Sequence, residues 1–284
     1  MRKHKFSSKH VLIAAVLLMI WGLLSTEIPA GIAGYIAGLF MGLTDIENTG
    51  LDGCYFYVGI ASLFAAFLVL LIHKWWFKPE FKGCLKIEKP DACIKLSAVY
   101  MIYLAAGVLE IYLFSGFTGV TCDGAGMALM AGICEETAFR ALPVSLMLRY
   151  WNREDKILNV MWVSAVCFAL SHALNAAAGA SALMTVYQVF CCLGAGAFFA
   201  ALFIRTGSIL PCMLLHFMQD LLGSMDEGIG DSLLYSKTVF GGAQIIDCIT
   251  CVILAACAIY FLRAEKREEI VSLLNSKWSK GSSF

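Results

Sequence analysis

Long apolar runs alternate with short polar stretches along the whole chain. A helix needs about 20 apolar residues to cross a bilayer. Eight runs approach that length and are predicted to be membrane spans: residues 11–24, 55–72, 96–114, 127–148, 157–174, 183–204, 209–222 and 243–262. Because the stretches between them are short, we predict an all-α fold, a polytopic transmembrane helix bundle of about eight spans. One integral-membrane domain, residues 1–284, is expected.

Residues 27–40 are the ambiguous part of this pattern. They follow the first run and are rich in glycine and alanine after Pro29. Such a segment fits a kinked extension of the first span, a re-entrant piece or a further full span. A further span would break the charge pattern of the connections.

The charges between the predicted spans alternate in sign. Residues 1–10 contain four basic and no acidic residues, whereas residues 25–54 contain four acidic and no basic ones. Residues 73–95 then contain six lysines against three acids, and the later charged stretches continue the alternation. Because basic residues collect on the cytoplasmic side of a membrane, eight spans predict that both termini are cytoplasmic.

Composition agrees with a multi-pass integral membrane protein. Hydrophobic residues make up 60% of the chain, charged residues only 15%, and the mean hydropathy is +0.78. The 21 basic residues balance the 21 acidic ones, and no basic or aromatic cluster suggests a nucleic-acid surface. We therefore expect the lipid bilayer of the cell membrane as the surroundings, and no nucleic acid as a partner.

Three charged residues interrupt the apolar span at residues 127–148: Glu135, Glu136 and Arg140. Each ionised side chain near the bilayer centre costs roughly 2.5–3.5 kcal/mol on insertion scales. Glu136 and Arg140 are four residues apart and can form an ion pair on one helix face, which leaves Glu135 free to point elsewhere. Pro143 removes one helical hydrogen bond and frees the carbonyl group of Phe139, which predicts a kink in this helix. A purely structural ion pair is the alternative interpretation.

Two histidines also fall inside predicted spans. His172 closes the sequence FALSH, and His216 opens HFMQD with Asp220 one helical turn away on the same face. A single intramembrane histidine often serves only helix packing, but two of them with a spare carboxylate favour a functional site. Their positions along the spans indicate that Glu135, His172 and His216 could share one cavity near the middle of the bilayer.

Hydrolysis of an amide bond fits this set of residues. A carboxylate in a low-dielectric cavity can take a proton from water, and a histidine can donate to a developing oxyanion. Neither GxSxG nor HExxH occurs in the sequence. Glu135, His172 and His216 could instead be three ligands of a catalytic zinc ion with an open position.

The sequences EETAFR, FALSH and HFMQD, in this order on separate apolar helices, resemble three motifs of a known family. These are EExxxR, FxxxH and HxxxN or HxxxD of the CAAX protease and bacteriocin-processing family, also called CPBP or Abi. The resemblance covers about residues 127–222, the core that carries the motifs. It implies an eight-helix intramembrane glutamate protease, like the type II CAAX prenyl endopeptidases, that uses neither a metal nor another cofactor.

The resemblance also implies a role for each motif residue. By it, Glu135 activates water with His172, and His216 and Asp220 bind the oxyanion. Glu136 with Arg140 supports the site. Asp220 stands where the family more often has asparagine, and an ionised aspartate repels an oxyanion. Asp220 must then be protonated, or act only by orienting His216.

The expected substrate is a hydrophobic, lipidated or membrane-associated peptide. Neither prenyl recognition nor the choice of peptide can be read from the sequence. Two other functional classes stay open: a non-catalytic immunity or scaffold protein that binds a peptide in the same cavity, and a proton-coupled transporter that uses Glu and His as a relay.

Overall fold

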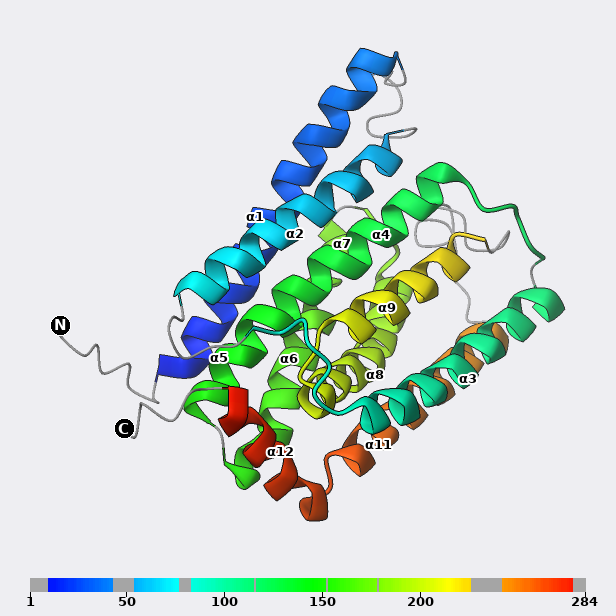
Figure 1. Cartoon of the computed structure of the whole chain (residues 1–284). Coiled ribbons are helices and arrows are strands. Elements are labelled where there is room, and N and C mark those ends of the chain that lie inside the picture. The colour runs from blue at the N-terminus through cyan, green and yellow to red at the C-terminus, as the bar shows by residue number, and fades with distance from the viewer. Residues whose placement is uncertain are drawn as a thin grey trace.

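The computed structural model describes residues 10–42, 54–76, 83–114, 116–151, 153–177, 179–225 and 242–277. Within these ranges the chain forms a bundle of helices that pack side by side (Figure 1). Six helices of the described ranges are long and apolar enough to cross a membrane. The predicted spans at residues 127–148 and 209–222 are also helical and pack against each other. The all-α membrane bundle of about eight spans is therefore confirmed.

The helices keep the order of the predicted spans. The long apolar ones are α1 (Val11–Met41), α2 (Tyr55–Trp76), α3 (Pro90–Phe114), α6 (Ile157–Ser171), α8 (Ala182–Thr206) and α11 (Gly242–Phe261). The motif residues lie on α4 (Cys122–Glu136), the π-helical turn η2 (Thr137–Ala141), α5 (Leu142–Tyr150), α6 and α9 (Leu210–Gly223). Shorter elements are η3 (Glu154–Lys156) and α7 (Leu174–Ala177), and α12 (Ala264–Lys277) follows α11.

Helix α1 settles the ambiguous segment after the first apolar run. Residues 27–40 extend the first span as one helix with Pro29 inside it, and Gly42 closes the helix in the left-handed conformation (φ 66°). The helix has 31 residues, which corresponds to about 46 Å at 1.5 Å per residue. Glu27 therefore lies within a helix and not in a connection, where the charge pattern had placed it.

Glycines let α1, α2 and α4 approach one another at backbone distance. A methyl group on Gly126 of α4 would lie 2.1 Å from the carbonyl oxygen of Tyr55, and one on Gly59 of α2 would lie 2.5 Å from the carbonyl oxygen of Gly126. A methyl group on Gly34 of α1 would lie 2.8 Å from the amide nitrogen of Val58. Small residues at such contacts are typical of helix packing in membranes.

We expect Gly126→Ala to lower the melting temperature of the purified protein, because the added methyl group collides with backbone and overpacking costs about 1–3 kcal/mol. Gly31→Ala is the matched control, since a methyl group there meets nothing within 4 Å. Alanine is the better helix former, so the control should be neutral or slightly stabilising. Equal melting temperatures for the two variants would contradict this close contact between α2 and α4.

The centre of the bundle is α8, which packs against both α6 and α11. Its second half, residues 194–206, is buried without a break, and it is the most buried of the six long helices. Phe198 and Phe199 belong to this stretch and lie in the main hydrophobic core. The fold thus brings aromatic side chains of α8 to the level of the motif residues on the neighbouring helices.

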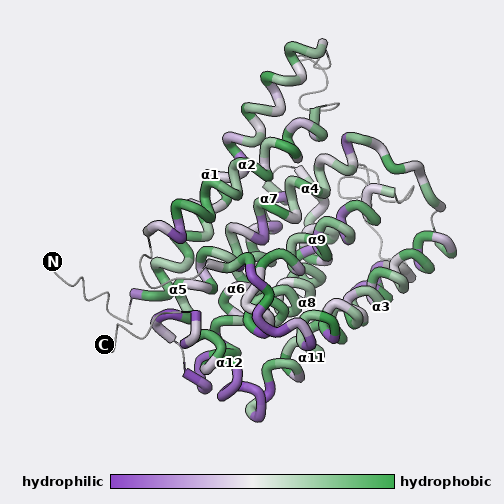
Figure 2. The backbone as a smooth tube through the Cα atoms, in the orientation of Figure 1, coloured by the Kyte–Doolittle hydropathy of each residue, from purple (hydrophilic) through white to green (hydrophobic). Residues whose placement is uncertain are grey.

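Hydrophilic residues gather at one end of the bundle, around α12 and the segment before α3 (Figure 2). Glu269 of α12 pairs with Lys89 at 3.1 Å and with Arg205 at 3.4 Å. The hydrogen bond from Lys89 is the main cause that lowers the pKa of Glu269. The alternating charge of the connections between the spans predicts that this end of the bundle faces the cytoplasm. This orientation stays a prediction.

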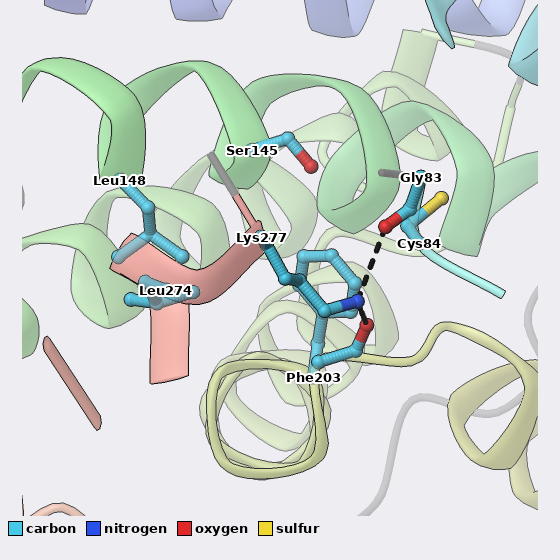
Figure 3. A pocket seen from close by; sticks show the side chains of 8 residues that line it. Gly83, Cys84, Ser145, Leu148, Phe203, Leu274 and Lys277 are labelled. Carbon is cyan, nitrogen blue, oxygen red and sulfur yellow. Dashed lines mark hydrogen bonds between the residues drawn. The ribbon is translucent and has the colours of Figure 1, made fainter. Parts of the chain in front are cut away.

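Lys277 connects α12 to the segment before α3 and to the connection between α8 and α9. Its ammonium group donates to the carbonyl oxygen of Gly83 at 3.1 Å and to that of Gly207 (Figure 3). Burial lowers the pKa of Lys277, and the carboxylate of Glu88 acts in the opposite direction. Gly207 lies in the short connection between α8 and α9, so Lys277 holds the segment that leads into the helix with HFMQD.

Candidate active site

A π-helical turn interrupts the helix that carries the first motif. The amide of Leu142 donates to the carbonyl oxygen of Thr137, five residues earlier. Pro143 has no amide hydrogen and cannot donate to the carbonyl group of Phe139. The hydroxyl of Ser164 from α6 donates to that carbonyl oxygen at 2.9 Å. The group that Pro143 was predicted to free is thus satisfied by a neighbouring helix.

The predicted ion pair is present and fully enclosed. Nη1 of Arg140 lies 2.9 Å from Oε1 of Glu136, and neither side chain has any exposed surface. The guanidinium group lies 4.1 Å from the centre of the Phe168 ring, which is a cation–π contact. Nη2 also donates to the carbonyl oxygen of Gly196 at 3.5 Å. A side chain on Gly196 would collide with Phe168, so this glycine makes room for the pair.

His216 joins the ion pair to the other carboxylates. Its Nδ1 lies 2.8 Å from the same Oε1 of Glu136 that pairs with Arg140. On the other side of the ring, Nε2 lies 3.6 Å from Oε2 of Glu135 and 3.5 Å from Oδ2 of Asp220. The ring of Phe199 stacks on the imidazole with centroids 5.2 Å apart. These contacts fix both the position and the plane of His216.

Exposure divides this cluster into an inner and an outer part. The side chains of Glu136 and His216 are 0% and 5% exposed, whereas those of Glu135 and Asp220 are 20% and 30% exposed. The inner pair is enclosed by protein, except for a small exposed part of His216. Glu135 and Asp220 are the members that a water molecule or a peptide can reach.

His172 is connected to the cluster through an aromatic ring. It follows the last residue of α6, so the helix ends before it, three residues short of the span predicted to reach residue 174. The hydroxyl of Ser171 donates to the carbonyl oxygen of Phe168, and such local bonding competes with helix continuation. The Phe168 ring contacts His172 at 5.0 Å and His216 at 5.9 Å, edge to face.

The Nε2 atom of His172 is buried and has no hydrogen-bond partner in the described residues. The contacts of the described chain join Glu135, Glu136, Arg140, His216 and Asp220 directly. They join His172 only through Phe168. A buried ring nitrogen without a partner is available to a group that the protein itself does not supply, such as water.

Two site residues were missed by the sequence analysis. The hydroxyl of Tyr100 on α3 donates to Oε1 of Gln219, the neighbour of Asp220 on α9. Tyr100 is fully buried, and its ring contacts those of Phe198 and Phe199 at 5.2 and 4.9 Å. A polar residue in the apolar span at residues 96–114 and an amide within HFMQD were the available signals.

The sequence left a zinc site open as an alternative. No three His, Cys, Asp or Glu residues in the described ranges are gathered as a set that could hold a metal ion.

Residues 95–222 match the model of a protein family described as type II CAAX prenyl endopeptidase Rce1-like. The matched region runs from α3 to α9 and includes all three motifs as well as Tyr100. This match supports the resemblance to the CAAX protease family that the three motifs indicate. No curated protein and no solved structure matches it. The match over residues 95–222, together with the apolar helices, fits an integral membrane protein related to a family of proteases.

Proposed function

We propose that this protein is an intramembrane endopeptidase of the cell membrane that hydrolyses a peptide bond with water activated by Glu135. Its substrate is a hydrophobic, lipidated or membrane-associated peptide. The observation that carries the proposal is the position of Glu135, a partly exposed carboxylate 3.6 Å from Nε2 of the enclosed His216. A base beside a fixed hydrogen-bond donor is the arrangement that amide hydrolysis requires.

Glu135 acts as the general base in this proposal. It takes a proton from a water molecule whose oxygen attacks the carbonyl carbon of the scissile bond. The same proton then passes from Glu135 to the nitrogen of the leaving amine as the carbon–nitrogen bond breaks. The unpartnered Nε2 of His172 would hold the water in place.

His216 stabilises the oxyanion that forms on the carbonyl oxygen. Glu136 is paired with Arg140 and lies 2.8 Å from Nδ1 of His216, so in this proposal Nδ1 carries a hydrogen and donates to Glu136. In this proposal Nε2, which faces the carboxylates of Glu135 and Asp220, carries a second hydrogen and donates it to the oxyanion. Distances of 3.5 and 3.6 Å are longer than hydrogen bonds, and catalytic contacts often tighten only when substrate binds.

Glu136 and Arg140 position the reacting groups without touching the substrate. The ion pair holds His216 through one shared oxygen and is itself packed between the rings of Phe168 and Phe199. Asp220 restrains His216 from the substrate side. Together these contacts supply the preorganised site that electrostatic catalysis needs.

Cleavage of a peptide library by the purified protein in detergent tests the proposed function. New amino and carboxyl termini, detected by mass spectrometry, are the expected result, and the Glu135→Gln variant prepared in the same way should produce none. A peptide-binding scaffold or a transporter would leave every peptide intact.

We expect the activity to be independent of zinc. Nδ1 of His216 has the carboxylate of Glu136 as a partner, whereas no acceptor for a ring nitrogen of His172, of the kind that metal-bound histidines usually need, lies in the described ranges. Elemental analysis should find less than one zinc per chain, and exhaustive chelation should leave the cleavage rate unchanged. Lost activity that returned on adding zinc, with about one metal per chain, would instead make Glu135, His172 and His216 ligands.

A further inference from the structure

If Asp220 is ionised and acts only by orienting His216, it gives the oxyanion no hydrogen-bond donor. Unlike the asparagine that often stands at this position in the family, a carboxylate has no N–H group to offer. His216 would then be the only side chain of the motifs that donates to the oxyanion. Gln219, the preceding residue, carries an amide group of the missing kind.

The contact with Tyr100 fixes which end of this amide is free. The hydroxyl of Tyr100 donates to Oε1 of Gln219, so the carbonyl end of the amide is occupied. Tyr100 cannot easily move, because it is fully buried and its ring contacts two phenylalanines of α8. The amide nitrogen of Gln219 points away from this bond and keeps both of its N–H donors.

Those donors have no partner in the part of the chain that the structure describes. The hydrogen bond with Tyr100 is the one that Gln219 makes there. The nitrogen is also not among the buried polar atoms that lack a partner, and the side chain of Gln219 is only half-buried. The donors are thus neither used by the protein nor sealed off from a ligand.

The helix places Gln219 beside His216. At about 100° per residue, Gln219 and Asp220 lie on either side of His216, about 60° and 40° from it around α9. Phe199 links the two partners further, since its ring stacks on His216 and contacts Tyr100. A substrate carbonyl group held by Nε2 of His216 would lie within reach of this flank of the helix.

We propose that Gln219 is a catalytic residue that donates its amide N–H to the oxyanion, and that Tyr100 is the positioning residue that orients it. The inference rests on the proposed function and adds a donor and its support to it. The amide of Gln219 supplies what Asp220 lacks. The bond to Tyr100 prevents the amide from turning its oxygen toward the developing negative charge.

Kinetics of four variants, measured on a peptide that the wild type cleaves, test this inference. Gln219→Leu should lower kcat by about 10²–10³-fold, the loss typical for one oxyanion donor, with a smaller change in KM. Asp220→Asn in the Gln219→Leu background should raise kcat at least about tenfold above that of Gln219→Leu, because it returns an amide to the neighbouring position. Tyr100→Phe should lower kcat by less than Gln219→Leu does. Tyr100→Phe combined with Gln219→Leu should be no slower than Gln219→Leu alone.

Tyr103→Phe is the matched control, since its ring lies 5.1 Å from that of Tyr100 and it is not bonded to Gln219. Its kcat should equal that of the wild type. Full activity of Gln219→Leu would overturn the inference, and so would a loss of activity that Asp220→Asn fails to reduce. A wild-type protein that cleaves no peptide would overturn the proposed function first, and this inference with it.

Discussion

Replacement of Glu135 by glutamine is expected to abolish peptide cleavage while the protein stays folded and inserted. The amide keeps the shape of the side chain but cannot accept a proton from water, and general-base catalysis typically contributes about 10²–10⁴-fold. Glu135 is 20% exposed and lies beyond hydrogen-bond distance of His216, so the neutral amide disturbs few contacts. Cleavage rate and melting temperature, measured on the same detergent preparation, check both halves of this expectation.

Glu110→Gln is the control for this change. Glu110 is another acidic residue of a membrane helix, near the end of α3 opposite to α12, and it has no role in the proposed mechanism. The control should cleave at the wild-type rate. An active Glu135→Gln variant would show that another group takes the proton from water.

The second large effect is expected for Arg140→Leu, which should destabilise the whole bundle and not only inactivate it. The change leaves the carboxylate of Glu136 buried without its cation, and removing one partner of a buried ion pair typically costs about 3–5 kcal/mol. It also removes the contact with Phe168 and the hydrogen bond to Gly196. The melting temperature and the yield of inserted protein should both fall.

Two further variants separate charge from packing. Glu136→Gln combined with Arg140→Leu should recover part of the stability, because no unpaired charge remains. Arg153→Leu removes the 3.0 Å ion pair with Asp155, whose side chains are 71% and 53% exposed, and should not change stability measurably. If Arg140→Leu melted like the wild type, Glu136 would have to be neutral in the folded protein.

The sequence was informative wherever a signal is local. The ion pair between Glu136 and Arg140 follows from a spacing of four residues, and the structure contains it. The apolar runs predicted the membrane-spanning helices, because the length of a span is set by the thickness of the bilayer. Pro143 predicted a freed carbonyl group at Phe139. This signal is also local, because the missing amide hydrogen is a property of one residue.

Contacts between distant segments could not be predicted in this way. Ser164 as the donor to Phe139, His216 as the second partner of Glu136, and Tyr100 as the partner of Gln219 all depend on which helices pack together. The residue at which α1 ends could not be predicted from the sequence either. A proline in an apolar segment is compatible with a kink, a break or an uninterrupted helix, and in the structure α1 continues through Pro29 as one helix that packs on α2.

The length of α1 has a consequence for the membrane itself. At about 46 Å it exceeds the roughly 30 Å of hydrocarbon in a typical bilayer, and exposed apolar side chains continue along it as far as Phe40 and Met41. Such hydrophobic mismatch is relieved by tilting the helix or by thickening the lipid around it. Since α1 also touches the π-helical turn next to the site, lipid chain length becomes a means of straining the first motif from outside.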